Sequence, residues 1–299
     1  NSQDICGPVG IPTLSIGVAD AKEIQEKLKA GSVSATMKVD NEVEIDAGTT
    51  YNITGVLKGK SSDHQILVGG HYDVHFQGFQ DDNCAVGLVL AMANAMVKSG
   101  YQPENDIVFC LHGAEEWGSS YTQYDWTVGA WEMINHVHPE WVGKVIADLN
   151  FELPALAHGT RARIRSCYEY VSFLEEYLAD LPNLTIAYPE ETAVTSPIET
   201  WSDDFSMAIA GVPSMVNDFT GGSFMETHYH SQFDNDEFYD EQVYRLHHEL
   251  FALLILALDE TAVVPLQFSP VVQRIRKGLE QCREICYRAD VAGQLGEKK

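Results

Sequence analysis

The sequence predicts an α/β protein with a mixed, mostly parallel central sheet and helices on both faces, a three-layer sandwich. Short apolar runs bounded by turn residues alternate along the chain with longer amphipathic or Ala- and Leu-rich segments, which is typical of β-α units. The chain has 299 residues, 45% of them apolar, so it is long enough to bury a large core. In such sheets functional sites lie at the carboxyl ends of the strands.

The strand predictions rest on short runs rich in β-branched, apolar or aromatic residues. These runs are residues 51–59, 64–73, 106–113, 144–151, 161–167, 184–189 and 213–219. The helix predictions rest on longer segments of strong helix formers or of helical periodicity. They cover residues 85–100, 168–181 and 241–260.

Both ends of the chain differ from this central pattern. Residues 1–48 contain one short strand-like run and one helical segment, which cannot form a core alone. Residues 266–299 form a helix-like segment without a partner of its own. We therefore expect a central domain over residues 49–265, flanked by pieces of two further domains, and a chain that is incomplete at both ends.

Composition excludes several classes of function. The formal charge of -25, from 44 acidic and 19 basic residues, opposes binding to nucleic acid or to an anionic membrane. No uncharged apolar stretch of about 18 residues predicts a membrane span. The six cysteines show no CxxC pair and mostly lie in apolar segments, so we expect free thiols.

Polar side chains follow the predicted strand over residues 64–73. His71 and Asp73 are two positions apart, so their side chains leave the same face, and the aspartate can orient the imidazole. Asp81 and Asp82 follow a glycine-containing loop. Taken alone, these two carboxylates are equally well explained as caps of the next helix.

Three further segments supply the same kinds of side chain. They contribute Glu115 and Glu116 after one strand, Asn150 and Glu152 after another, and His228, Tyr229 and His230 in a polar loop. Histidine with carboxylate suits zinc, and five ligands with one shared carboxylate suit a two-metal hydrolytic centre. Cys84 lies at a helix start without a histidine partner in the sequence, which argues against a cysteine hydrolase.

These segments resemble the successive motifs of the M28 family of co-catalytic zinc peptidases, which includes aminopeptidases and glutamate carboxypeptidase. The motifs are "GGHYDVHFQGFQDDN", "GAEEWGS", "NFE", "SDDFSMAIAGVP" and "YHSQFDN", in the family's order over residues 51–260. Residues 1–48 resemble the last part of a protease-associated domain. Residues 266–299 resemble the start of a C-terminal helical domain, which implies a possible homodimer.

The resemblance implies two zinc ions per chain and five ligands. His71 and Glu152 would hold one ion, and Glu116 and His230 the other. Asp81 would bridge the two ions. The probable capping residue of the pair at positions 81 and 82 is then Asp82.

The resemblance also implies three catalytic roles. Glu115 matches the general base that takes a proton from the metal-bridging water. Asp73 matches the partner that orients the first histidine ligand, and Tyr229 is placed to donate to the developing oxyanion.

Several positions depart from the family pattern or stay ambiguous. Glu152 stands where the family usually has aspartate, so Asp148 is an alternative ligand. His75 and His228 are expected to be neighbours of the site rather than ligands. Asp203 matches a recurrent family aspartate, although a helix N-cap explains it equally well. The remaining pair, His136 and His138, fits a solvated helix end.

Specificity is less clearly indicated. Arg161, Arg163 and Arg165 share one strand face and could receive a substrate carboxylate, but an exposed edge strand explains them slightly better. No arginine stands near "GVPSMVNDF", where a glutamate carboxypeptidase would be expected to have one. An aminopeptidase-like exopeptidase acting on peptides is therefore favoured.

Two other functions remain as alternatives. A zinc acyl transferase like glutaminyl cyclase would need only one metal, and a non-catalytic receptor would be expected to have lost ligands, whereas all five positions are filled. Family members often act outside the cytoplasm, which favours an extracytoplasmic location, while the free cysteines favour the opposite.

Overall fold

Within the described part of the chain, seven strands form one sheet in the order β1-β3-β2-β4-β7-β5-β6. The structure is a computed structural model that describes residues 14–40, 48–118, 126–156, 163–181, 187–188, 193–218 and 222–296. The strands are β1 (Ile53–Leu57), β2 (Gln65–His71), β3 (Asp106–His112), β4 (Val145–Asn150), β5 (Arg163–Ser166), β6 (Ala193–Thr195) and β7 (Ser214–Asn217).

The sheet is mixed and mostly parallel, as predicted. β2 lies between β3 and β4 and is parallel to both, β4 is parallel to β7, and β5 is parallel to β6. Only the pairs β1–β3 and β5–β7 are antiparallel. The carboxyl ends of β2, β3 and β4 therefore meet at one edge.

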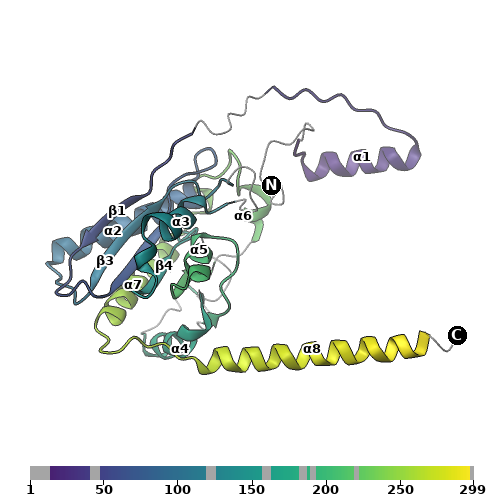
Figure 1. Cartoon of the computed structure of the whole chain (residues 1–299). Coiled ribbons are helices and arrows are strands. Elements are labelled where there is room, and N and C mark those ends of the chain that lie inside the picture. Colours follow the sequence, from purple (N-terminus) through teal and green to yellow (C-terminus); the bar gives the residue numbers. More distant parts are fainter. Residues whose placement is uncertain are drawn as a thin grey trace.

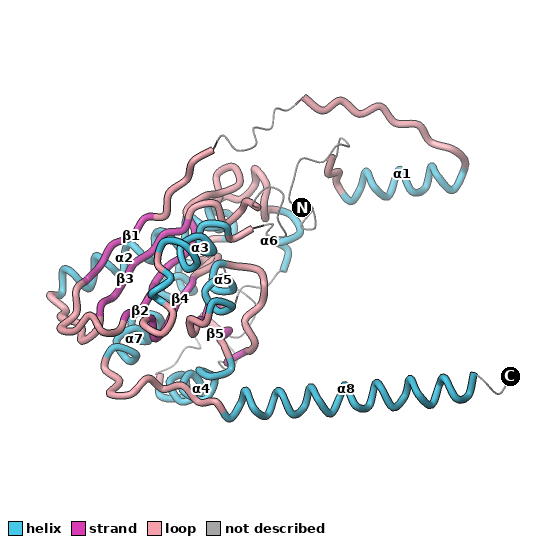
Figure 2. The backbone as a smooth tube through the Cα atoms, in the orientation of Figure 1, coloured by secondary structure: helices cyan, strands magenta, loops and turns pink. Residues whose placement is uncertain are grey.

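Helices cover both faces of the sheet (Figures 1 and 2). One core cluster packs the sheet against α2 (Cys84–Ser99), α4 (Val171–Asp180) and α7 (Glu241–Asp259). The other packs it against α3 (Val128–Glu132) and α5 (Asp203–Ala210). β2 serves both clusters because its side chains alternate, with Ile66 and Val68 in the first and Leu67 in the second. The expected three-layer sandwich is confirmed.

Two helices stand apart from this body (Figure 1). α1 (Val18–Ala30) has no buried residue, and α8 (Ser269–Gly296) extends away from the sheet. The helix predictions for both flanks are confirmed. The short strand expected before α1 is absent from residues 14–17, and its earlier part lies outside the described residues.

The sequence does not predict the strand at one edge of the sheet. Most of the predicted strand over residues 184–189 lies outside the described residues, and Ala187 and Tyr188 do not form a strand. The edge position is taken by β6, whose three residues are too few to show an alternating pattern in the sequence.

A search of the helices within the described ranges finds none with the length and apolar character that crossing a membrane requires.

Candidate metal centre

The ends of three adjacent strands position most of the predicted site. His71 is the last residue of β2 and lies opposite the last residue of β3, just before the turn that carries Glu115 and Glu116. On the other side of β2, β4 ends at Asn150, two residues before Glu152. Segments that are distant in sequence thus bring one imidazole and three carboxylates to one edge.

A first group of possible ligands surrounds His71. Its Nε2 atom lies 3.1 Å from Asp81 Oδ1 and 3.6 Å from Glu152 Oε2. All three residues are buried, and their ligand atoms lie within 4.8 Å of one another. Three ligand atoms this close together could hold one divalent cation.

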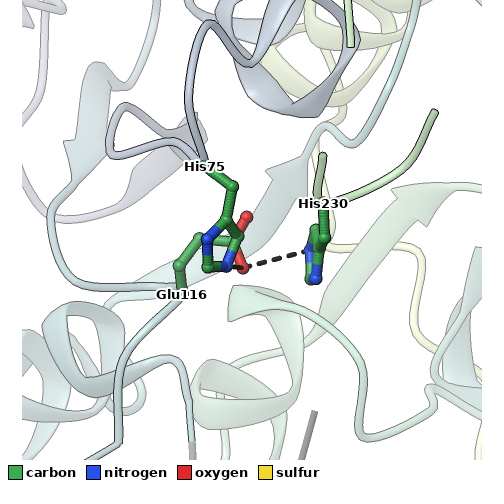
Figure 3. Close-up of side chains that lie close together, drawn as sticks. All are labelled: His75, Glu116 and His230. Carbon is green, nitrogen blue, oxygen red and sulfur yellow. Dashed lines mark ion pairs between the residues drawn. The ribbon is translucent and has the colours of Figure 1, made fainter. Parts of the chain in front are cut away.

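A second group lies beside the first, and Figure 3 shows three of its side chains, those of His75, Glu116 and His230. His230 Nε2 lies 3.1 Å from Glu116 Oε2 and 3.0 Å from Asp81 Oδ2. His75 Nε2 lies 3.0 Å from the same Glu116 oxygen, and the ligand atoms of His75, Glu116 and His230 again lie within 4.8 Å of one another. Asp81 therefore directs one carboxylate oxygen to each group. His228, by contrast, pairs with Glu237 at 3.1 Å.

Asp73 supports both groups, in a way that the sequence does not reveal. Its main-chain oxygen lies 2.8 Å from His71 Nδ1, whereas its carboxylate is 3.7 Å from that nitrogen. The carboxylate instead accepts hydrogen bonds from the backbone N–H groups of Glu115 and Glu116, at 3.0 and 3.2 Å. Asp73 thus ties the end of β2 to the turn after β3.

Asp82 does not cap the following helix, so that prediction is wrong. Its side chain is fully buried, and Oδ1 accepts the backbone N–H of Leu153 at 3.1 Å. The helix α2 has no side-chain cap. The packing around Asp82 is tight, because a Cβ atom at Gly70 would lie 3.2 Å from Asp82 Oδ2.

Asp234 holds the segment that carries Asp81. Its two carboxylate oxygens accept the backbone N–H groups of Gln80 and Asp81, at 2.9 and 3.1 Å. Asp234 comes from the loop after His230, 153 residues further along the chain than Asp81. Sequence analysis missed it because only the fold brings the two loops together.

Burial and crowding shift the titration of these groups in opposite directions. Burial would raise the pKa of Asp81, but the imidazoles of His230 and His71 hold it below its usual value. Burial raises the pKa of Glu115, which the neighbouring carboxylates raise further and His71 opposes. Burial would lower the pKa of His230, yet Asp81 and Glu116 raise it to about 9. Closely spaced and buried carboxylates thus favour the binding of an additional positive charge.

The arrangement fits a divalent cation in two further respects. The donor set combines imidazole nitrogen with carboxylate oxygen, which suits zinc and related ions. Glu116 Oε1 is buried and has no hydrogen-bond partner among the described residues. Buried carboxylate oxygens of this kind need a compensating cation or donor.

Tyr229 lies over the second group. Its ring stacks on that of His230, with centroids 3.7 Å apart and an angle of 21° between the planes. Burial raises the pKa of Tyr229, and the carboxylates of Asp81, Glu115, Glu116 and Glu152 raise it further. The phenol therefore stays protonated at neutral pH and remains a hydrogen-bond donor.

Glu152, rather than Asp148, reaches the centre. The hydroxyl of Ser202 donates to Glu152 Oε1, and the Asn150 amide donates to Ser202 Oγ. Asp148 does not belong to either group of possible ligands. It is buried elsewhere, and burial raises its pKa to about 7, with His112 opposing the shift.

Other predicted residues lie outside the two groups. Asp203 pairs with His112 at 3.0 Å, and the N-cap of α5 is Ser202 without a side-chain cap, so the capping explanation of Asp203 is wrong. His136 and His138 lie on the surface beside Glu132 and Glu140, as expected.

The predicted substrate arginines are neutralised within the fold. Arg163 lies 3.1 Å from Asp218, and Arg165 lies 3.1 Å from Asp218 and 2.9 Å from Glu199. β5 lies between β7 and β6, so the edge-strand explanation is wrong, and Arg161 lies outside the described residues. A small pocket that includes Ser202, the hydrogen-bond donor to Glu152, is lined by Arg165, Glu199, Trp201, Ser202, Asp204, Val216 and Asp218.

Left-handed backbone conformations concentrate at the centre. Among the described non-glycine residues with positive φ, Phe76 follows His75, Ala114 precedes Glu115, Leu153 follows Glu152, and His230 is itself one. The remaining one, Thr127, donates its backbone N–H to Glu115 O at 2.7 Å. Such conformations cost about 1 kcal/mol or more each and cluster at functional sites.

Similarity to known proteins points the same way. The chain is 28% identical to a probable leucine aminopeptidase 2 of Aspergillus fumigatus over 146 residues, which are 48% of this chain and 27% of that protein. It is 21% identical to a probable glutamate carboxypeptidase of Arabidopsis thaliana over 300 residues, 90% of this chain and 42% of that protein. The chain therefore spans less than half the length of these relatives.

A solved structure shares the fold. A zinc aminopeptidase of Bacillus subtilis superposes with a TM-score of 0.55 at 19% identity, over 72% of this chain and 52% of that one. Residues 52–255, well over half of the chain, match the sequence model of Peptidase family M28, and the chain belongs to that family.

Proposed function

We propose that this protein is a co-catalytic dinuclear zinc exopeptidase, which hydrolyses a terminal peptide bond of peptides. The observation that carries the proposal is the position of Asp81 between two groups of possible ligands. One carboxylate oxygen lies 3.1 Å from His71 Nε2 and the other 3.0 Å from His230 Nε2. A carboxylate shared in this way is the bridge that a pair of ions about 3.5–4 Å apart requires.

Each ion would have its own set of ligands. His71 and Glu152 would hold one ion, Glu116 and His230 the other, and Asp81 both. When bound, the two ions would polarise the scissile carbonyl and lower the pKa of a water molecule. Two groups of ligands that share Asp81 favour a peptidase over an acyl transferase of the glutaminyl cyclase kind, which would use one ion.

Two neighbouring side chains would perform the proton transfer and the charge stabilisation. Glu115 is buried and carries a raised pKa, which suits a base that accepts a proton and returns it to the leaving amine. Tyr229 stays protonated and would donate a hydrogen bond to the carbonyl oxygen as negative charge develops there. Asp73 would keep the Glu115 backbone in place through its hydrogen bond to the N–H group.

Charge favours an aminopeptidase over a carboxypeptidase. In the pocket that includes Ser202, Arg165 is balanced by Glu199 and Asp218, and Asp204 is a further acid. A substrate carboxylate would find no uncompensated positive charge there. Relatives with both names, leucine aminopeptidase and glutamate carboxypeptidase, support the reaction class rather than the choice of terminus.

The flanking helices belong, in our proposal, to neighbouring domains. α1 would end a protease-associated domain covering residues 1–48, and α8 would begin a helical domain from residue 266 that forms a homodimer. The support is that α1 buries none of its residues and that α8 extends away from the sheet.

The experiment combines metal analysis with a substrate panel. Wild type and Glu115→Gln are measured for zinc content and assayed against free, N-blocked and glutaminyl dipeptides, with ammonia release followed for the last. Glu132→Gln is the control, because Glu132 is exposed and pairs only with a surface histidine.

We expect about two zinc ions per chain in all three proteins and loss of hydrolysis by at least about 100-fold in Glu115→Gln alone. Preference for free amino termini would support the aminopeptidase. A metal-free wild type, full activity in Glu115→Gln, or ammonia release without hydrolysis would contradict the proposal.

A further inference from the structure

We infer that His75 is an additional ligand of the ion held by Glu116 and His230, an inference that rests on the proposed dinuclear centre. Its Nε2 lies 3.0 Å from Glu116 Oε2, as close to that oxygen as His230 Nε2 at 3.1 Å. Figure 3 shows the two imidazoles converging on one carboxylate.

The spacing of these atoms suits a common ion. Ligands about 2.0–2.2 Å from a tetrahedral zinc ion lie roughly 3.3–3.6 Å from one another. The contacts within the group are 3.0 and 3.1 Å, and the ligand atoms of His75, Glu116 and His230 all lie within 4.8 Å of one another. A small outward movement of each side chain would therefore make room for zinc between them.

The carboxylate at the middle of the group is not satisfied by these contacts. The Glu116 side chain is 5% exposed, and its second oxygen, Oε1, is buried without a hydrogen-bond partner among the described residues. One oxygen facing two imidazoles and the other facing no donor are expected of a metal ligand rather than of a simple ion pair.

The local backbone presents His75 to this position. His71, Asp73 and His75 are spaced two apart along the segment that leaves β2, and the chain then turns through a left-handed residue, Phe76, with φ of 57°. The residues after Glu152 and before Glu115 have the same unusual conformation. The backbone beside His75 therefore has the same unusual conformation as the backbone beside Glu115 and Glu152.

The additional ligand makes the two ions unequal. With His75, Glu116, His230 and Asp81, one ion would have four protein ligands, while the other would have three, His71, Glu152 and Asp81. Four protein ligands fill the tetrahedral positions of zinc, so that ion would reach a reacting group only by expanding to five ligands, whereas three protein ligands leave a position open. The ion at His75 would then bind more tightly, and the ion at Glu152 would present the open position.

The test measures zinc directly in wild type, His75→Ala and His75→Gln. Each protein is freed of metal and titrated with zinc against a competing chelator, and X-ray absorption is recorded with one equivalent bound. His228→Ala is the matched control, because His228 lies in the loop of His230 and pairs with Glu237 instead. Circular dichroism checks that each variant is folded.

We expect the affinity of the tighter site to fall more than about 100-fold in both His75 variants, beyond the 10- to 100-fold typical of residues that only orient a ligand. The first zinc should show roughly two imidazoles in wild type and roughly one in the variants. His228→Ala should match wild type in both measurements.

Two results would overturn the inference while leaving the proposed function intact. One is unchanged zinc affinity in the His75 variants. The other is a loss of affinity with an unchanged number of imidazoles, because His75 would then only orient Glu116. A wild-type protein that binds no zinc would contradict the proposed function itself, and this inference with it.

Discussion

Glu152 depends on its neighbours to reach the centre. It is one methylene longer than the aspartate usual at this position of the family, and Ser202 and Asn150 form a chain of hydrogen bonds that ends on its Oε1 atom. Because Ser202 holds Oε1, the other carboxylate oxygen of Glu152, Oε2, faces His71. Orientation by such a neighbour typically affects metal affinity by 10- to 100-fold.

Ser202→Ala should therefore weaken binding of one zinc ion by roughly 10- to 100-fold and leave the other unchanged. Zinc titration against a chelator measures both sites. Ser214→Ala is the matched control, since Ser214 is also buried but donates to Val212 O. Equal weakening in the two variants would show that Ser202 has no specific role.

The buried carboxyl of Asp148 leads to a prediction about how stability depends on pH. The pKa of Asp148 is about 7 in the folded protein, mainly because of burial, and about 3.9 when unfolded. Between these values the folded state holds a proton that the unfolded state has lost. The neutral form of Asp148 therefore makes its full contribution to the free energy of unfolding below about pH 4, and this contribution is lost as the pH rises through about 7.

Asp148→Asn keeps a neutral side chain at every pH. The variant should match wild type near pH 4 and be more stable near pH 8, by up to roughly 4 kcal/mol, which is about three pKa units at 1.36 kcal/mol each. Urea unfolding at both pH values measures the difference. A loss of stability near pH 8 would contradict the assigned ionisation.

At the level of elements, the loops are held by buried aspartates that tie distant segments together. Asp234 accepts hydrogen bonds from the backbone of η1 (Phe79–Asn83), which carries Asp81. Asp259, at the end of α7, does the same for the backbone of Glu104 and Asn105, just before β3. The first clamp supports the proposed metal bridge, and the second supports only the fold.

This pair provides a matched experiment. Asp234→Ala and Asp259→Ala should each cost about 1–3 kcal/mol for every buried N–H group left unpaired. Only Asp234→Ala should also lower zinc affinity, because only η1 carries a proposed ligand. Urea unfolding and zinc titration separate the two effects. Unchanged zinc affinity in Asp234→Ala would show that the clamp does not position Asp81.

An element could be predicted where the pattern that identifies it lies within a run of neighbouring residues. β2, β3 and β4 were identifiable because each is a short apolar run ending in polar residues, so His71, Glu115 and Glu116 could be placed at one edge. β6 was missed because three residues show no pattern. Asp82 was misassigned because its position suggested a cap, whereas its partner is the backbone of Leu153, 71 residues away.

The same limit applies to the site. The expected ligands meet because strand ends converge, which the pattern of the sheet predicts. Ser202, Asp234 and the role of His75 depend on how separate loops pack, and no local pattern indicates that packing. The pairing of Arg165 with Asp218 and Glu199 likewise depends on the packing of β5 beside β7, which no local pattern in the sequence indicates.

At the scale of the whole molecule, metal binding should couple to stability and to pH. The centre gathers several carboxylates in little solvent, and burial and repulsion raise the pKa of Glu115 and Glu152. Bound zinc would offset this repulsion. Because His230 has a pKa of about 9, zinc must displace its proton at neutral pH, and the apparent affinity should fall as the pH falls.

Removal of zinc by a chelator should therefore lower Tm near pH 8 more than near pH 6. Ligand saturation at about 100 times Kd contributes roughly 2.7 kcal/mol, and this contribution shrinks as protons compete. Thermal unfolding with and without chelator at both pH values measures the effect. An equal or larger change near pH 6 would contradict the assigned protonation.

Two zinc ions on either side of the Asp81 carboxylate would be visible by anomalous X-ray scattering at the zinc absorption edge, from crystals of the wild-type protein grown with zinc. We expect two peaks about 3.5–4 Å apart at this edge of the sheet, one beside His71 and Glu152 and the other beside Glu116 and His230. A single peak, or no peak within reach of Asp81, would contradict the proposed dinuclear centre.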